Sequence, residues 1–190
     1  MTTPEHENDE PTIDEDLKAR CAPIELLILD VDGVLTDGRI VIDDRGVESK
    51  NFHVRDGLGL ALWRRSGKKT AIVSGRSAAA VARRAEELKI DRLHQGIENK
   101  EAAVRELLED WNLDASRACF VGDDLNDLPG LLAVGLAACP ADAVAEARRV
   151  AHLTTRAAGG RGAVREVVET IMKAQGLWRA ACERYGSPAM

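Results

Sequence analysis

Residues 26–33 read Leu26-Leu27-Ile28-Leu29-Asp30-Val31-Asp32-Gly33, a short apolar run that ends in two carboxylates and a glycine. Much later in the chain, Ala118-Cys119-Phe120-Val121 runs into Gly122-Asp123-Asp124, and Asp127 follows about one helical turn further on. Each pattern predicts a buried parallel strand with acidic residues at its carboxyl end. Ligands bind at that edge of an open α/β sheet, and carboxylates gathered there repel one another unless a hard cation such as Mg²⁺ neutralises them. The sequence therefore predicts a metal-dependent active site.

Outside these two stretches, apolar runs alternate with helical patterns, which predicts an α/β fold with a doubly wound parallel sheet. Strands are expected at Glu25–Leu29, Thr70–Val73, Arg92–Gln95, Ala118–Val121, Val134–Ala138 and Val150–Leu153. Helices are expected at Leu58–Arg65, Ser77–Leu88, Lys100–Asn112, Asp127–Ala133, Ala141–Arg149 and Ala163–Ala174. The segments Arg39–Ile42 and Glu48–Phe52 predict a small β-hairpin. The 41 residues of 33–73 and the 25 of 75–99 are used up by such elements, so neither gap holds a cap domain.

The chain has 190 residues, which predicts one domain with its own hydrophobic core. Its net charge of −6 is concentrated in residues 1–20, so residues 1–22 are expected to form an acidic, disordered leader. Residues 23–175 would form the catalytic domain, and residues 176–190 a loosely held C-terminal tail. The sequence lacks a basic face for nucleic acid and an apolar run that could span a membrane. Four widely spaced cysteines fit a reduced, cytoplasmic protein, with Cys119 and Cys139 in its core.

Two further positions gain meaning from their order in the chain. Ser74, in Val73-Ser74-Gly75-Arg76, offers a hydroxyl beside a predicted helix start, where phosphate oxygens can bind. Lys100 begins another predicted helix. Taken singly, Ser74 could be a simple helix cap, Lys100 a solvated side chain, and Asp30-Val31-Asp32-Gly33 a surface turn.

Together these motifs resemble those of the haloacid dehalogenase-like superfamily of phosphohydrolases. The matching residues are Asp30-Val31-Asp32-Gly33, Ser74, Lys100, and Gly122-Asp123-Asp124 with Asp127. Residues 30–38, 52–57 and 158–166 are further similar to the capless branch that holds the 3-deoxy-D-manno-octulosonate 8-phosphate phosphatases, which act in lipopolysaccharide precursor synthesis. That likeness covers roughly residues 24–175.

The resemblance implies a role for each matching residue. Asp30 would be the nucleophile that carries a transient aspartyl-phosphate, and Asp32 would act as general acid and then general base. Mg²⁺ would bind Asp30, the carbonyl oxygen of Asp32, and Asp123, with Asp124 and Asp127 as close support. Ser74 and Lys100 would hold the remaining phosphoryl oxygens. These ligands are all oxygens, which favours Mg²⁺ over Zn²⁺.

The sequence indicates the residues that bind the sugar end of the substrate less clearly than those that bind the phosphate. Arg76, Arg55 and Arg84 are candidates to bind a sugar-acid carboxylate, because guanidinium groups bind carboxylates bidentately. The turn Gly159-Gly160-Arg161-Gly162 fits either a mobile segment that seeks phosphate or carboxylate, or a loop that leads into a helix.

A capless site is open to water unless a neighbouring subunit covers it. The resemblance therefore implies a homo-oligomer, most simply a tetramer, with the hairpin at the interface and the segment around Arg161 reaching a neighbour's site. Two alternatives remain at this point. One is the same chemistry on a nine-carbon, sialic-acid-type sugar phosphate, and the other is a non-catalytic oligomerising module related to domains fused to sugar-nucleotide synthetases.

Overall fold

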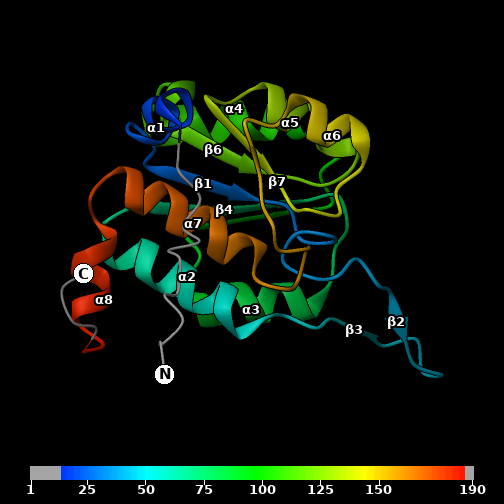
Figure 1. The fold of residues 1–190 in the computed structure, drawn as a ribbon. Coiled ribbons are helices and arrows are strands. Elements are labelled where there is room, and N and C mark those ends of the chain that lie inside the picture. Colours follow the sequence, from blue (N-terminus) through cyan, green and yellow to red (C-terminus); the bar gives the residue numbers. More distant parts are fainter. Residues whose placement is uncertain (1–13, 187–190) are drawn as a thin grey trace, which may run out of the picture.

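A six-stranded, wholly parallel sheet forms the centre of this computed structural model, which describes residues 14–186 (Figure 1). The strand order is β5-β4-β1-β6-β7-β8, so the chain moves outward in one direction from β1, returns, and moves outward in the other. The order reverses between β1 and β6, which pair with Leu29 opposite Val121. In a doubly wound sheet this switch point opens a crevice at the carboxyl ends of the strands.

The elements largely follow the predicted pattern of apolar runs and helical stretches. The strands are β1 (Leu26–Leu29), β2 (Val41–Ile42), β3 (Glu48–Ser49), β4 (Lys69–Ser74), β5 (Arg92–Gln95), β6 (Ala118–Val121), β7 (Leu136–Cys139) and β8 (Leu153–Thr154). The helices are α1 (Glu15–Cys21), α2 (Val54–Arg65), α3 (Ala79–Leu88), α4 (Lys100–Asp110), α5 (Leu128–Leu132), α6 (Ala145–Val150), α7 (Ala163–Ala174) and α8 (Trp178–Glu183). Two short 3₁₀ turns, η1 (Ala115–Arg117) and η2 (Leu125–Asp127), flank β6.

Helices cover both faces of the sheet (Figure 1). Helices α2, α3 and α7 pack on one face around Trp63 and Ile171, and α4, α5 and α6 pack on the other around Phe120 and Leu107. All four residues of β1 are buried, and they alternate between the two cores. A strand apolar on every residue is what burial between two helical layers requires, so the predicted α/β class is confirmed.

The β-hairpin β2–β3 extends away from the body of the molecule, and no cap domain occupies the stretch from Asp32 to Ser74 (Figure 1). Its strands pair over only two residues each, with Val41 opposite Ser49 and Ile42 opposite Glu48. The paired region is therefore shorter than the predicted strands, although the hairpin itself lies where the sequence predicts it.

Both ends of the chain differ from the prediction. Residues 15–21 form α1, because the Asp14 side chain accepts a hydrogen bond from Leu17 N (2.7 Å) and the helix buries Cys21. The prediction of a disordered leader over residues 1–22 is therefore wrong for this part, and residues 1–13 lie outside the described residues. Likewise α8 packs the predicted loose tail onto the core, with Ala181 buried, while residues 187–190 lie outside the described part.

Candidate active site

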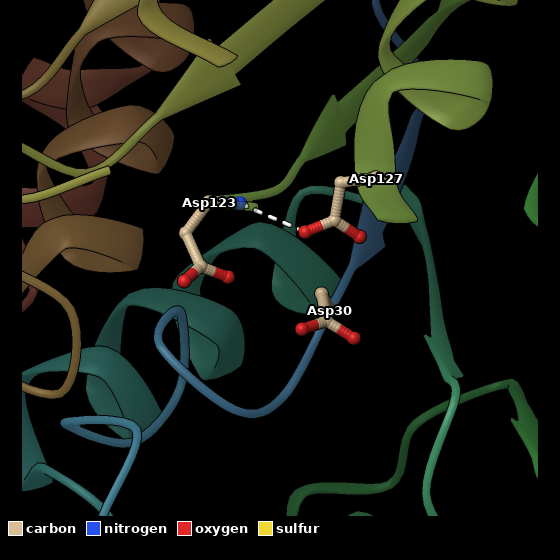
Figure 2. A group of neighbouring side chains, drawn as sticks. All are labelled: Asp30, Asp123 and Asp127. Atoms are coloured by element: carbon tan, nitrogen blue, oxygen red, sulfur yellow. Dashed lines mark hydrogen bonds between the residues drawn. The ribbon is translucent and has the colours of Figure 1, made fainter. Parts of the chain in front are cut away.

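The predicted carboxylates meet at the switch point between β1 and β6 (Figure 2). Asp30 directly follows β1, Asp123 is the second residue after β6, and Asp127 is the last residue of η2. One carboxylate oxygen from each of the three lies within 4.8 Å of the others. In Figure 2 these side chains point toward a common space from two separate stretches of the chain. The two strand ends that the sequence marked as acidic therefore form one site.

Lys100, at the start of α4, lies buried between two of these carboxylates. Its Nζ donates to Asp30 Oδ1 at 2.7 Å and to Asp127 Oδ1 at 2.5 Å, and its side chain is 1% exposed. Burial lowers the pKa of Lys100, but the charges of Asp30 and Asp127 outweigh it and raise the pKa overall. The lysine is thus held as a cation at the bottom of the site.

The pKa values of the neighbouring acids Asp30 and Asp123 are raised as well, by burial and by the charges of the other carboxylates. Burial and the nearby charge of Asp127 raise the pKa of Asp30 to about 6, although Lys100 partly offsets this. Burial and the charges of Asp127, Asp30 and Asp124 raise the pKa of Asp123 to about 8. Two buried acids, the partly buried Asp123 and one lysine leave an excess of negative charge, which a bound cation would neutralise.

Asp127 and Asp124 mainly build the loop. Asp127 Oδ2 accepts from the backbone N–H groups of Asp123 (2.9 Å) and Asp124 (3.2 Å), and Asp127 Oδ1 accepts from Lys100. The Asp124 side chain caps η2 by accepting from Leu125 N at 2.7 Å. Both carboxylates are therefore occupied by protein donors.

Asp123 and Asp30 remain the freest to hold a divalent cation. Asp123 Oδ1 is buried and has no hydrogen-bond partner among residues 14–186. A buried carboxylate oxygen without a donor is costly unless something else binds it. An all-oxygen donor set of this kind fits a hard ion such as Mg²⁺.

Gly33 is required by this arrangement. Its φ is +91°, and a Cβ placed there would lie 2.0 Å from Asp123 Oδ2. A glycine at this position therefore lets the Asp123 carboxylate come close to the Asp30 loop.

Asp32 belongs to a separate ring of charges at the mouth of the site. Lys50 Nζ bonds Asp32 Oδ1 and lies 2.9 Å from Glu48 Oε1. Arg76 lies 3.0 Å from Glu48 Oε2 through Nη2 and 3.6 Å from Asp32 Oδ2 through Nε. Asp32 and Arg76 were predicted from the sequence, whereas Glu48, in the hairpin strand β3, and Lys50, directly after that strand, were not. Only their spacing of two, which puts both side chains on one face of a strand, could have suggested them.

Ser74 is buried at the end of β4, which pairs with β1. Its expected place at a helix start is wrong, because α3 begins only at Ala79, after a bend. The Ser74 hydroxyl instead accepts from Arg76 N at 3.3 Å.

The other arginines lie apart from the carboxylates. Arg55 is exposed in the first turn of α2. Arg84 pairs with Glu87 at 2.8 Å and lies over the ring of Phe52. The structure does not bring either arginine into contact with the site acids among the described residues.

The glycine-rich turn is fixed within its own chain. Gly160 N donates to Val34 O at 3.0 Å, and a Cβ on Gly159 would lie 1.7 Å from Gly33 O. Arg161 lies 3.6 Å from Asp37. The turn therefore supports the Asp30 loop and leads into α7, which matches the expected helix-entry loop, while the reach of Arg161 toward a neighbouring subunit stays a prediction.

Comparison with known proteins places this geometry in context. A model of the haloacid dehalogenase-like hydrolases matches residues 53–135. The 3-deoxy-D-manno-octulosonate 8-phosphate phosphatase of Escherichia coli strain B is 44% identical over 86% of this chain and 87% of its own.

Solved structures agree with the sequence relatives. A probable YrbI family phosphatase from Pseudomonas syringae is 44% identical, with a TM-score of 0.89 over 92% of this chain and 99% of that one. The 3-deoxy-D-manno-octulosonate 8-phosphate phosphatase of Moraxella catarrhalis, solved with magnesium, phosphate and KDO, is 39% identical, with a TM-score of 0.87 over 88% and 97%. The chain thus belongs to the haloacid dehalogenase-like hydrolases and, within them, to the 3-deoxy-D-manno-octulosonate 8-phosphate phosphatase family.

Proposed function

We propose that this chain is a Mg²⁺-dependent phosphatase that converts 3-deoxy-D-manno-octulosonate 8-phosphate into the free sugar acid and phosphate, in lipopolysaccharide precursor synthesis. The observation that carries the proposal is the buried contact of Lys100 with Asp30 and Asp127, beside Asp123 and at the switch point of the sheet. Such a site can balance the charges of a phosphate group, a nucleophilic carboxylate and a divalent cation. The identity of the sugar rests on relatives that are 44% identical over most of both chains.

Asp30 and Asp32 would divide the chemistry between them. An Asp30 oxygen would attack phosphorus while the bond from phosphorus to the sugar oxygen breaks, and Asp32 would give that oxygen a proton. Asp32 would then take a proton from the water that hydrolyses the aspartyl-phosphate, which releases phosphate and restores Asp30. Each step leaves Asp32 in the protonation state that the next step needs.

Asp30, Asp123 and the carbonyl oxygen of Asp32 would hold Mg²⁺, with Asp124 and Asp127 fixing the loop behind them. The ion would offset the negative charge of the nucleophile and of the phosphate, which otherwise repel. Lys100 and Ser74 would bind the phosphoryl oxygens from the protein side, and the buried ammonium of Lys100 supports this role.

Arg76 is the best placed of the arginines for the sugar-acid carboxylate. Its side chain is 46% exposed at the mouth of the site, beside Asp32. Arg84 and Arg55, on α3 and α2, would contribute only from the outer rim, and Arg161 only through the Asp37 loop.

The hairpin supports assembly into a homo-oligomer, which we propose is a tetramer. Four large apolar side chains on it are about half exposed, namely Ile40, Val41, Ile42 and Val47. A two-stranded hairpin is only marginally stable alone, so copies of it are expected to pack together. Sedimentation of the protein and of an Ile40→Asp, Ile42→Asp variant tests this: the variant should be monomeric, and a monomeric parent protein would contradict the proposal.

A cytoplasmic location is consistent with the four cysteines, all of which are free thiols. Within residues 14–186, no helix has the length and apolar character to cross a bilayer.

The decisive experiment is phosphate release from a panel of sugar phosphates. We expect the eight-carbon acid phosphate to be preferred over a nine-carbon, sialic-acid-type phosphate, with activity lost on chelation and restored by Mg²⁺. Asp30→Asn should lower turnover by several powers of ten while the protein still folds, because it removes the attacking oxygen and its charge. Preference for the nine-carbon substrate would correct the sugar, and no hydrolysis at all would favour a non-catalytic module.

A further inference from the structure

Lys50 is an unusual lysine, because its side chain is shielded from solvent although the residue belongs to an exposed hairpin. It follows β3 directly, and its side chain is 1% exposed, whereas Ile42 on the facing strand is 58% exposed. Burying an ammonium is costly unless carboxylates compensate it. Two do so here, Asp32 and Glu48.

The four charged groups form a closed ring, in which Asp32, Lys50, Glu48 and Arg76 alternate in sign. Each oxygen of Glu48 faces a cation: Oε1 lies 2.9 Å from Lys50 Nζ as an ion pair, and Oε2 accepts a hydrogen bond from Arg76 Nη2 at 3.0 Å. Glu48 therefore fixes the two cations relative to each other, and the cations in turn fix Asp32. Lys50 is the best shielded member, since Asp32 and Glu48 are each 19% exposed and Arg76 is 46% exposed.

The two carboxylate oxygens of Asp32 differ in their hydrogen bonds. Oδ1 accepts from Lys50 and lies 3.5 Å from the hydroxyl of Thr36. Oδ2 is buried and has no hydrogen-bond partner among the described residues, with only the Arg76 charge at 3.6 Å. A carboxylate that transfers a proton does so through an oxygen that no protein donor occupies, and in Asp32 that oxygen is Oδ2.

We propose that Lys50 is a positioning residue for the phosphatase reaction: it anchors Oδ1 of Asp32 and leaves Oδ2 as the oxygen that gives and takes the proton. This inference rests on the proposed function, in which Asp32 is the acid and base. Lys50 is already bonded to two carboxylates and shielded from water, so it acts through Asp32 and does not bind the substrate. Glu48 assists by holding Lys50 in place.

Loss of the contact between Lys50 and Asp32 should lower kcat/KM most on substrates whose leaving group needs a proton. A primary alkyl phosphate, such as the sugar phosphate, releases a poor leaving group, whereas p-nitrophenyl phosphate releases one that departs without protonation. The ratio kcat/KM reports the steps through release of the alcohol or phenol, so comparing it for the two substrates isolates proton donation.

The test uses Lys50→Met, Lys50→Arg, Glu48→Gln and the control Lys69→Met, with Mg²⁺ present. Lys69 is a half-exposed lysine paired with Asp91 at 3.2 Å, so its substitution removes an ion pair remote from Asp32. Lys50→Met should lower kcat/KM on the alkyl phosphate by about ten- to hundred-fold, less than the roughly 10²–10⁴-fold that a general acid contributes, because Asp32 itself remains. On the aryl phosphate the loss should be less than about threefold. Lys50→Arg should restore much of the loss, Glu48→Gln should show a smaller loss of the same kind, and Lys69→Met should match the parent.

Other outcomes overturn the inference. Equal losses on both substrates would mean that Lys50 only supports the fold, and unchanged kinetics would mean that Asp32 does not need the anchor. If Lys50→Met fails to fold, Glu48→Gln decides by the same comparison. A parent protein that hydrolyses neither ester would refute the proposed function itself, and the role of Lys50 with it.

Discussion

At the scale of single residues, the most constrained position is Gly33. Its positive φ is one obstacle to any other residue, and the 2.0 Å that would separate an added Cβ from Asp123 Oδ2 is a second. Backbone strain of this kind costs about 1–3 kcal/mol, whereas the collision displaces the carboxylate that is freest to hold a cation.

The two obstacles can be separated with a matched control. Gly46 also has a positive φ, +77°, but nothing lies within 4 Å of its Cβ position. Gly33→Ala and Gly46→Ala should both lower the free energy of unfolding, while only Gly33→Ala should weaken Mg²⁺ binding and abolish turnover. Urea denaturation and metal titration measure these effects; full activity in Gly33→Ala would show that Asp123 is not needed where it lies.

A second residue-scale prediction follows from the raised pKa values of Asp30, about 6, and Asp123, about 8. Both carboxyls must lose their protons to bind a cation, so protons and Mg²⁺ compete. Below each pKa the group is protonated, and affinity for Mg²⁺ should therefore rise as pH increases from about 5 to about 9 and then level off. Calorimetric titration in buffers of different ionisation enthalpy would detect the released protons, and an affinity independent of pH would contradict this.

Much of the site could be predicted residue by residue, because its acidic side chains closely follow buried strands. Asp30 and Asp123 were marked by apolar runs that end in acids, which is a local pattern. Lys50 could not be found in this way, since its partners Asp32 and Glu48 come together only when the hairpin folds back. The burial of its side chain is a tertiary property, and its only local trace is the spacing of two between Glu48 and Lys50.

At the scale of elements, α2 and α7 pack together, and the side chain of Asp56 adds a hydrogen bond between them. Asp56, in the first turn of α2, is 1% exposed and accepts a hydrogen bond from Arg165 N (2.8 Å) at the start of α7. Gly162, which precedes α7, offers no capping side chain. Asp56 thus serves as a cap that comes from another helix.

Replacing this cap should destabilise the protein in a way that depends on the substitute. Asp56→Ala should lower the free energy of unfolding by about 1–2 kcal/mol, because it leaves the α7 donor without its partner. Asp56→Asn keeps an acceptor and should cost less. Thermal and urea unfolding compare the two variants, and equal losses would show that the hydrogen bond is not the cause.

The same pair carries a pH dependence. Burial raises the pKa of Asp56 above its ordinary value of 3.8. The folded state then binds the proton more tightly than the unfolded state, so the stability that Asp56 contributes is greatest below pH 3.8 and falls as pH rises through the raised pKa. Asn does not titrate, and the stability of Asp56→Asn relative to the parent should therefore increase over that range.

Element boundaries were less predictable than the elements themselves. Helix α2 begins at Val54, four residues before its predicted start at Leu58. Gly57 and Gly59 lower the helix propensity of this stretch, but packing against α7 and the His53 cap outweigh that cost. Propensity is a local quantity, and the packing that overrides it is not.

At the scale of the whole molecule, the alternation of strands and helices predicted the parallel sheet. The helices α1 and α8 near the ends of the chain were not predicted. Gln175 Nε2 donates to the carbonyl oxygens of Cys21 (2.8 Å) and Ile24 (2.9 Å), which ties the end of α7 to the segment after α1. Trp178 in α8 stacks with Arg165, whose guanidinium lies 4.8 Å from the ring centre. Contacts between residues so far apart in sequence leave no local pattern to recognise.

The hairpin places Lys50 and Glu48 at its base and Ile40 and Ile42 on its exposed strand. If copies of the hairpin hold one another in place, the activity of each subunit depends on the equilibrium between assembled and dissociated protein. Specific activity on the sugar phosphate should then be constant at high enzyme concentration and fall on dilution below the dissociation constant of the assembly, with a lag in progress curves begun from dilute stock. Activity proportional to enzyme concentration down to the monomeric range would show that each subunit works alone.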